Sequence, residues 1–246
     1  MKSRRLGVSL GVNLLPTDTK VCSFDCIYCE CGWTPKKYEH KVELPSRKMV
    51  SQRMEEKLKE MIENHELPDV ITFAGNGEPT LHPEFEGIID DTIQLRDRLS
   101  PKARIAVLSN ATMLHKASVV RALLKVDDNI QKLDSGIEAT IRKIDCPSSN
   151  FKLPEVVAKL KSFDGKVIIQ TLFLHGEFKG EIIDNTTEEE LTEWLKLIAE
   201  IKPSQVMIYT IDRDTPASGL EKVKLDELNQ IADCARKIGF EVQVSG

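Results

Sequence analysis

Three closely spaced cysteines are the residues of this sequence best suited to chemistry. Cys22, Cys26 and Cys29 follow the pattern C-x3-C-x2-C, and Cys31 comes two residues later. Thiols packed this closely either form disulfides or bind a metal. Three on one short loop suit three irons of a [4Fe–4S] cluster and leave the fourth iron open to a bound molecule. Zinc is the alternative, although structural zinc sites usually use two separated pairs of cysteines.

The composition is that of an ordinary globular protein. Of the 246 residues, 41% are hydrophobic and 30% are charged, so we expect one domain over 1–246, with the cluster loop at 20–33. A net charge of −5 argues against a surface dedicated to nucleic acid. No apolar run is long enough to span a membrane, which predicts a cytoplasmic protein without membrane contact. In that reducing compartment, clustered cysteines bind metal more often than they form disulfides.

Strand-like and helix-like segments alternate along the whole chain. The predicted helix that begins at Thr187 has a strong start signal, because Asn185-Thr186-Thr187 precede three glutamates. The predicted strands are Val8–Leu15, Asp69–Ala74, Ala103–Leu108, Asn129–Leu133, Val167–Leu174, Gln205–Ile211 and Phe240–Val244. The predicted helices are Val50–Asn64, Pro83–Leu99, Lys116–Lys125, Glu138–Ile144, Leu153–Ser162, Thr187–Ile201 and Lys224–Lys237.

Six or seven such β/α units in one domain predict a parallel sheet with right-handed crossovers. A complete eight-unit barrel usually needs about 250 residues, and one or two units are missing here. The pattern therefore predicts an α/β fold, a partial (β/α)6 TIM-type barrel with a parallel sheet. Reactive groups in such folds lie at the carboxyl ends of the strands.

Polar and flexible residues do follow the predicted strands. Gly75 and Gly77 flank Asn76 after the second strand, and glycines at such a turn permit positive φ and expose the backbone to a ligand. Glu78 then offers a carboxylate to a cationic group. The later strands end in, or carry, the polar residues Ser109, Asn110, Lys132, Asp134, Gln170 and Tyr209.

The cysteine loop, with Tyr28 before its last cysteine, and the later stretch Gly75-Asn76-Gly77-Glu78-Pro79-Thr80 together resemble the radical S-adenosylmethionine (SAM) superfamily. In that family three cysteines hold a [4Fe–4S] cluster whose fourth iron binds the amino and carboxylate groups of SAM. Reduction of the cluster cleaves the sulfonium to a 5′-deoxyadenosyl radical, which abstracts hydrogen from the substrate. The resemblance implies an enzyme with these two cofactors, and a flavodoxin or ferredoxin partner that supplies the electron.

The resemblance also implies roles for individual residues. Cys22, Cys26 and Cys29 are the expected cluster ligands, and Tyr28 is expected to pack near the adenine. Glu78 and the backbone of Gly75–Gly77 are expected to hold the methionyl ammonium. The remaining candidates for contacts to SAM are Ser109, Asn110, Lys132, Gln170 and Tyr209, although Lys132 and Asp134 also fit a structural ion pair.

Within the superfamily the chain looks most like the wyosine-synthase-like branch. The supporting stretches are Leu10–Pro16, Phe73–Pro83, Lys132–Asp134, Ile169–Thr171 and Tyr209–Arg213. Enzymes of that branch carry a second cluster on cysteines upstream of the main motif. No cysteine precedes Cys22 here, so we expect a single cluster.

Three interpretations of the function follow. The branch resemblance implies a tRNA, a nucleotide or another small molecule as the substrate. The short chain and acidic balance fit instead a protein or peptide substrate, as for a maturase or activase. A non-catalytic iron–sulfur or zinc module is the third interpretation, and it predicts that Glu78→Ala leaves the function intact.

Other reactive side chains have simpler interpretations. Cys31 is expected to be a neighbouring thiol, Cys146 a packed side chain or a catalytic thiol, and Cys234 part of a helix core. His82 and His175 are expected to be structural or exposed. A run of cations after the loop forms a solvated face or steers an anionic partner, and consists of Lys36, Lys37, Lys41, Arg47 and Lys48.

Overall fold

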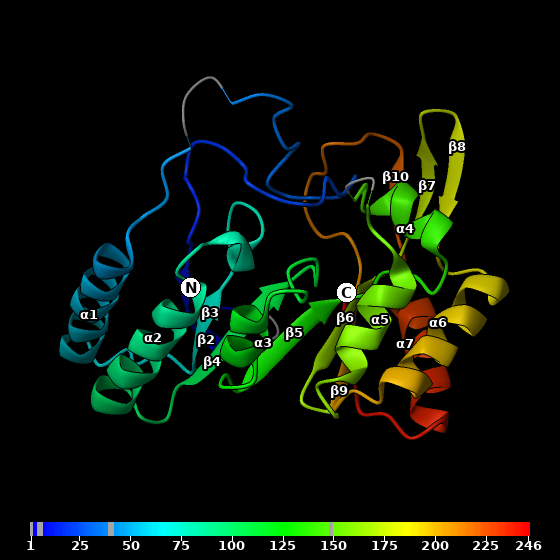
Figure 1. The fold of residues 1–246 in the computed structure, drawn as a ribbon. Coiled ribbons are helices and arrows are strands. Elements are labelled where there is room, and N and C mark those ends of the chain that lie inside the picture. Colours follow the sequence, from blue (N-terminus) through cyan, green and yellow to red (C-terminus); the bar gives the residue numbers. More distant parts are fainter. Residues whose placement is uncertain (1, 4–6, 39–41, 148–149) are drawn as a thin grey trace. The chain divides into compact units, whose positions relative to one another are not determined.

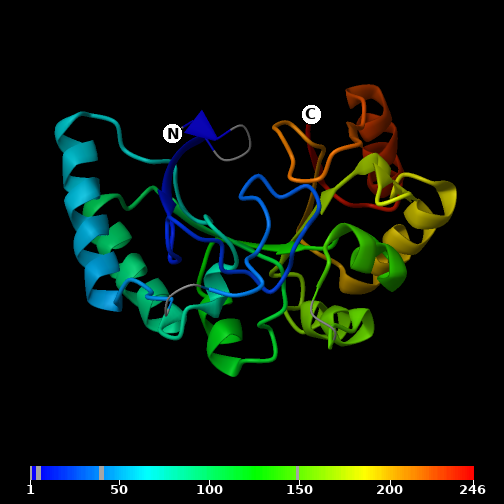
Figure 2. The same ribbon diagram turned by 90° about the horizontal axis from the view of Figure 1, so that it is seen from above.

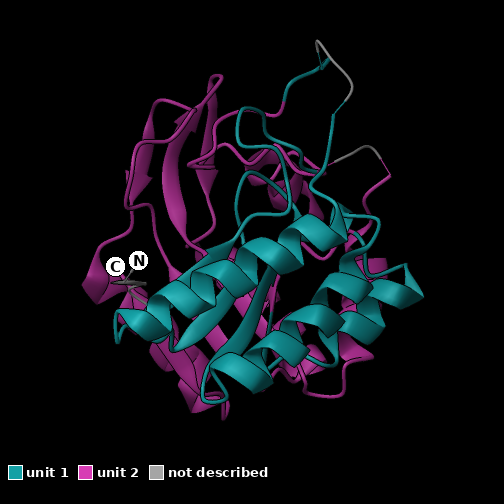
Figure 3. Cartoon of the chain, turned by 90° about the vertical axis from the view of Figure 1, so that its left-hand side faces the viewer, with its two compact units in different colours: residues 1–22, 35–109, 113–129 teal, residues 23–34, 110–112, 130–246 magenta. Residues whose placement is uncertain are grey.

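A computed structural model describes residues 2–3, 7–38, 42–147 and 150–246. Lys41, one of the predicted surface cations, lies outside these ranges. Contacts between Cα atoms divide the chain into two compact units (Figure 3). The first unit comprises residues 1–22, 35–109 and 113–129, and the second comprises 23–34, 110–112 and 130–246.

The first unit is a small sheet with helices on one face (Figure 2). Strands β2 (Gly7–Val12), β3 (Val70–Phe73) and β4 (Arg104–Ser109) are parallel, and β1 (Lys2–Ser3) pairs antiparallel with β2. All four residues of β3 are buried, as expected of a central parallel strand. The helical elements are α1 (Arg47–Glu63), the short 3-10 helix η1 (Pro79–Leu81), α2 (Phe85–Leu99) and α3 (Ala117–Leu123).

The second unit repeats the strand–helix order. Its parallel strands are β5 (Asp128–Lys132, which begins in the last residues of the first unit), β6 (Ile168–Leu172), β9 (Gln205–Tyr209) and β11 (Val242–Ser245). Its helices are α4 (Glu138–Ile144), α5 (Leu153–Lys161), α6 (Glu188–Ile201) and α7 (Leu225–Lys237). The Thr187 side chain accepts a hydrogen bond from the Glu190 amide at 3.3 Å, so the predicted start of α6 is confirmed.

A second, antiparallel sheet in this unit was not predicted. It consists of β7 (Leu174–Phe178), β8 (Glu181–Asp184) and β10 (Leu220–Lys222), in the order β10-β7-β8 (Figure 1). The prediction ended a strand at Leu174, which instead begins β7. The hairpin turn has positive φ at Lys179 and Gly180, the conformation of a two-residue type I′ turn.

The predicted fold class is confirmed. Helices alternate with parallel strands in both units, as the α/β partial-barrel interpretation requires. The largest error at an element's start is in α1, which begins at Arg47 rather than Val50 because the Ser46 side chain accepts from the Met49 amide. Among the residues that the structure describes, no helix is long and apolar enough to cross a membrane.

Candidate functional site

The middle of the cysteine loop is fixed by its own backbone. The Ile27 amide donates to the Ile144 carbonyl at 2.9 Å, and the Asp25 amide donates to the Asp145 carbonyl at 3.0 Å. Both acceptors lie at the carboxyl end of α4, where helix carbonyls lack partners of their own. On the other side of the loop, the Ala217 amide donates to the Ile27 carbonyl at 3.2 Å. This part of the loop is therefore held from two directions without using a cysteine side chain.

The cysteine side chains of the loop are thiols and not disulfides. Cys22, Cys26 and Cys29 are partly exposed, Cys31 is exposed, and none of them forms a disulfide. Cys22 belongs to the first unit, whereas Cys26 and Cys29 belong to the second. Partly exposed thiols can be reached by iron, as the ligands of an iron–sulfur cluster must be.

A site for a single metal ion is a different arrangement. Within the described ranges, no three His, Cys, Asp or Glu side chains gather closely enough to hold one metal ion. Ligands of a cluster each bind a different iron and lie farther apart than ligands of one ion. The cluster ligands therefore remain a prediction from the spacing of the cysteines.

Tyr28, between Cys26 and Cys29, is anchored by a buried carboxylate. Its hydroxyl donates to Oδ2 of Asp134, and the residue as a whole is 8% exposed. The Lys132 ammonium lies 2.5 Å from the same oxygen and 4.5 Å from the centroid of the Tyr28 ring. The other oxygen, Oδ1, accepts the Leu172 amide at 2.9 Å. Lys132 and Asp134 are thus a buried ion pair, one of the two roles predicted for them.

A second carboxyl group lies beside this pair. Asp145 Oδ1 is 3.3 Å from the Lys132 ammonium and has no hydrogen-bond partner among the described atoms. Burial raises the pKa of Asp145 to about 8, against the attraction of Lys132 and a hydrogen bond with the Cys26 side chain. Burial also disfavours the charged Lys132, but Asp134 and Asp145 outweigh it and hold the pKa of Lys132 well above its ordinary value. Lys132 therefore stays charged beside two carboxyl groups, of which Asp145 has the raised pKa.

The turn after β3 is built around the chain that leads to Cys22. The Val21 amide donates to the Asn76 carbonyl at 2.9 Å, and the Glu78 amide donates to the Val21 carbonyl at 3.1 Å. Gly77 has φ 135°, a backbone conformation that favours glycine. The predicted glycine turn thus also positions the residue next to the first cysteine.

Two of the predicted cofactor-binding side chains in this turn already have protein partners. Asn76 Nδ2 donates to the carbonyls of Pro16 and Thr17 at 3.1 and 3.0 Å. Glu78 is 2% exposed, and its Oε1 accepts the Thr80 amide at 3.0 Å as well as the Thr80 hydroxyl. Glu78 therefore caps η1, and its predicted role toward SAM stays a prediction.

The candidates that follow β4 differ in their surroundings. Ser109 is a buried residue at the end of that strand. Asn110 Nδ2 donates to the Ser23 hydroxyl at 3.0 Å, and Ser23 and Thr112 share a hydrogen bond of 2.6 Å. Asn110 thus supports the residue that follows Cys22, a role that the sequence did not suggest.

The remaining candidates lie on neighbouring strands of the second unit. Lys132 of β5 is in register with Gln170 of β6, and Leu172 of β6 is in register with Tyr209 of β9. Gln170 is 8% exposed. Tyr209 packs against the apolar cluster that contains Tyr28. The structure therefore brings Tyr28, Lys132, Gln170 and Tyr209 to the carboxyl ends of adjacent strands, as the strand-end argument expected.

Sequence reasoning missed Asp145 and Trp33. Asp145 precedes Cys146 at the end of a predicted helix, and no spacing rule marks it as a partner of Lys132. Trp33 stacks on Phe178 of β7, with ring centroids 5.9 Å apart, and this contact depends on the hairpin that was not predicted. His82 is buried and structural, because Nε2 contacts the Pro45 carbonyl at 2.8 Å and Nδ1 accepts the Glu84 amide at 3.1 Å.

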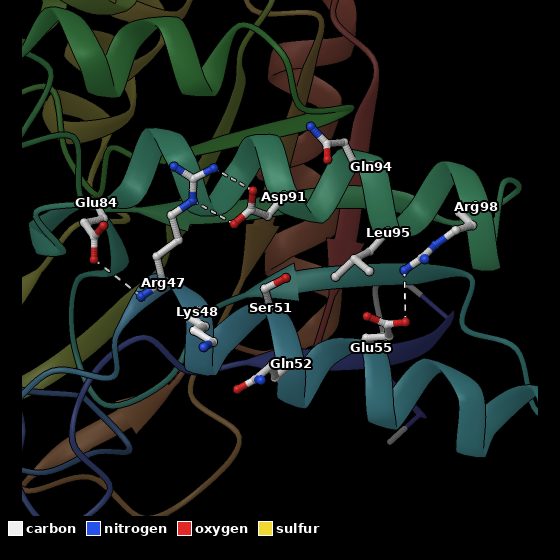
Figure 4. A pocket seen from close by; sticks show the side chains of 10 residues that line it. All are labelled: Arg47, Lys48, Ser51, Gln52, Glu55, Glu84, Asp91, Gln94, Leu95 and Arg98. Atoms are coloured by element: carbon white, nitrogen blue, oxygen red, sulfur yellow. Dashed lines mark hydrogen bonds and ion pairs between the residues drawn. The ribbon is translucent and has the colours of Figure 1, made fainter.

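A polar groove in the first unit lies between α1 and α2 (Figure 4). Its volume is about 740 Å³. Most of its charges are paired with one another: Arg47 contacts both Asp91 oxygens, at 2.6 and 2.7 Å, and Arg98 contacts Glu55 at 3.1 Å. The groove is thus lined by satisfied surface ion pairs.

Sequence comparison identifies the family. The model of the radical SAM superfamily matches residues 17–186, more than half of the chain. A protein named GTPase Obg from Brachyspira hyodysenteriae is 31% identical over 232 residues, which are 93% of this chain and 32% of that protein. The UPF0026 protein MJ1312 from Methanocaldococcus jannaschii is 29% identical over 233 residues, 93% of this chain and 67% of that protein. The chain thus spans about a third of the first relative and about two thirds of the second.

Solved structures share the fold at low sequence identity. A radical SAM methyltransferase from Sphaerobacter thermophilus matches with a TM-score of 0.71 at 13% identity, over 96% of this chain and 65% of that one. SuiB from Streptococcus suis bound to S-adenosylmethionine matches with a TM-score of 0.66 at 15% identity, over 97% of this chain and 51% of that one. TYW1 with a lysine-pyruvate adduct bound matches with a TM-score of 0.61 at 14% identity, over 95% of this chain and 72% of that one. The predicted wyosine-synthase-like branch therefore has only loose support, because structures outside it match at least as well.

Proposed function

This chain belongs to the radical SAM superfamily, and we propose that it is an enzyme whose Cys22, Cys26 and Cys29 hold a [4Fe–4S] cluster. The observation that carries the proposal is the C-x3-C-x2-C spacing on a loop whose backbone is anchored and whose cysteines form no disulfide. When bound, such a cluster passes one electron to SAM, giving methionine and a 5′-deoxyadenosyl radical that takes a hydrogen atom from the substrate.

The chain's own residues bind and orient the reactants in this proposal. Tyr28 packs against the adenine, and its buried ring excludes water from that side. Glu78, whose Oε1 accepts hydrogen bonds from Thr80, attracts the methionyl ammonium together with backbone carbonyls of the Gly75–Gly77 turn. Gln170 and Tyr209 line the same strand ends as Lys132 and supply polar contacts to the rest of SAM.

An external donor completes the electron balance. Each cleavage of SAM consumes one electron, and the three cysteines outside the motif are far apart in the sequence: Cys31, Cys146 and Cys234. We therefore include in the proposal a flavodoxin or ferredoxin that reduces the cluster.

Anaerobic reconstitution tests this function. The protein is loaded with iron and sulfide, reduced with dithionite and mixed with SAM, and 5′-deoxyadenosine is measured by mass spectrometry. We expect about four irons per chain and formation of 5′-deoxyadenosine, with both lost in Cys26→Ser. Cys31→Ser is the matched control, a cysteine of the same loop outside the motif, and it should retain both. Wild-type protein that binds zinc alone, or a cluster that never cleaves SAM, would refute the proposal.

A further inference from the structure

The second unit contains a buried polar cluster centred on Asp134, which is 1% exposed. Its carboxylate receives three donors: the Tyr28 hydroxyl, the Lys132 ammonium and the Leu172 amide. The Asp134 carbonyl receives a fourth donor, the Asn185 side chain, at 2.7 Å. Every one of these groups belongs to the same compact unit, so their mutual positions are those of one folded body.

Tyr28 is the member of this cluster that reaches the cysteine loop. Its ring packs in an apolar cluster with Ile27, Leu172 and Leu174. The hydroxyl is the only polar atom of that side chain, and burying it without a partner is costly. Asp134 supplies that partner, and the Lys132 ammonium over the ring face adds a cation–π contact. The hydroxyl therefore has one favourable position, next to Asp134.

An apolar alternative would have filled the same space at lower cost. Phenylalanine at position 28 keeps the ring packing, and buried ion pairs such as Lys132–Asp134 are often no more stable than well-packed apolar groups. A buried, fully hydrogen-bonded network does, however, restrict the side chains that it joins to one arrangement. Fixed geometry is what a loop with ligands on both sides of Tyr28 requires.

We propose that Asp134 is a positioning residue of the cysteine loop: it fixes the Tyr28 side chain and thereby the segment that carries the Cys26 and Cys29 thiols. The inference rests on the proposed function for the purpose of this positioning, but the positioning itself is a property of the protein without iron. Asp134 acts from the end of β5 through Tyr28 and not by contact with the cofactors.

Hydrogen exchange in the iron-free protein tests the positioning directly. The reporters are the amides of Ile27 and Cys29, which donate to the Ile144 and Cys26 carbonyls at 2.9 and 3.1 Å. Tyr28→Phe removes only the hydroxyl, so the fold should survive, and we expect both amides to exchange about tenfold faster. The Ile105 amide of β4, bonded to Asp127 at 2.8 Å, should keep its rate.

Two further variants separate positioning from general stability. Asp134→Asn removes the charge that holds Lys132 and should accelerate the same amides at least as much. Glu190→Gln is the control, because Glu190 is another buried carboxylate of the second unit and receives the Ser135 and Thr140 hydroxyls. It should lower the melting temperature without selective loss of protection at Ile27 and Cys29. Equal protection of these amides in wild type and Tyr28→Phe would overturn the inference.

The loaded protein gives an independent readout. In Tyr28→Phe we expect a cluster to form, but its electron paramagnetic resonance signal with SAM should be broader than that of wild type, because the ligand segment samples more positions. A wild-type protein without a cluster would refute the proposed function while the exchange experiment still decides the positioning. A wild-type cluster with unchanged exchange and an unchanged signal in Tyr28→Phe would reject the positioning alone.

Discussion

A Cβ atom on Gly77 would lie 1.8 Å from the carbonyl oxygen of Val21. The two residues form a parallel β-bridge, and Val21 immediately precedes Cys22. The contact is between two backbones, so no side-chain rotation can relieve it. This close approach links the turn after β3 to the start of the cysteine loop.

Gly77→Ala should therefore destabilise the protein and displace Val21. We expect a loss of about 2 kcal/mol or more in the free energy of unfolding, because the new atom clashes and φ is unfavourable for alanine. Urea unfolding measures the loss, and iron bound after reconstitution reports on Cys22. Gly11→Ala in β2 is the control, since its Cβ would meet no atom within 4 Å and the change should stay within about 0.5 kcal/mol. Equal effects of the two substitutions would contradict the explanation.

Gly87 of α2 gives a second prediction, in which the Arg47 side chain decides whether alanine at this position stabilises the protein. Glycine inside a helix is less favourable than alanine by about 1 kcal/mol, but here a Cβ would lie 2.4 Å from Nη1 of Arg47. Arg47 crosses the helix at this point to reach Asp91 (Figure 4). Gly87→Ala should therefore give little or no stabilisation in the wild type.

In an Arg47→Ala background the obstacle is gone, and Gly87→Ala should stabilise the protein by the full value of about 1 kcal/mol. A double-mutant cycle by thermal unfolding measures this difference. If Gly87→Ala stabilises the wild type and the Arg47→Ala variant equally, the Arg47 side chain does not limit the effect of alanine at position 87.

The ion pair of Arg104 and Asp128 predicts a dependence on pH. Burial raises the pKa of Asp128, while the Arg104 guanidinium opposes that shift. A carboxyl group with a raised folded pKa stabilises the fold below its unfolded pKa, and this stability is lost as the pH rises through the folded pKa. Arg104→Ala removes the opposing charge, so it should cost about 1 kcal/mol at pH 7, since the arginine is largely exposed.

The cost should shrink below pH 4, where Asp128 becomes protonated in both states. Unfolding by urea at about pH 7 and about pH 3 measures the two values. Adding Asp128→Asn should remove the pH dependence of the Arg104→Ala effect. A loss that stays constant between the two pH values would argue that the arginine acts through packing alone.

The order of the α/β elements and the strand-end residues could be predicted because both follow from local pattern. Strand β6 is buried at every residue and lies in a mostly apolar run, and α6 starts at a capping threonine. The antiparallel sheet could not be predicted in the same way. Its strands are short, β10 is distant from β7 in sequence, and Leu174 continues the apolar run of β6 without a break.

The candidate site shows the same division. Cysteine spacing and the Gly75–Glu78 turn are local signals, whereas the partners of Tyr28 and Lys132 arise only when β5, α4 and the cysteine loop come together. Alternation placed Lys132 and Asp134 on one face, but nothing local marks Asp145 as the second carboxyl group. Long-range polar contacts of this kind are set by the fold and not by sequence spacing.

The Asn185 side chain also makes long-range polar contacts, and these support the β7–β8 hairpin, which was not predicted from the sequence. It is 1% exposed, its Nδ2 donates to the Asp134 and Leu172 carbonyls at 2.7 Å each, and its Oδ1 accepts the Leu174 amide at 2.9 Å. Asn185→Ala leaves these buried backbone groups unpaired, so we expect a loss of about 3 kcal/mol or more in the free energy of unfolding. Ile182→Ala in β8 is the control, because that side chain is 81% exposed and should change stability by less than about 0.5 kcal/mol. Urea unfolding measures the free energy of unfolding of both variants. A similar small loss in each would mean that the Asn185 hydrogen bonds do not anchor β7 and β8.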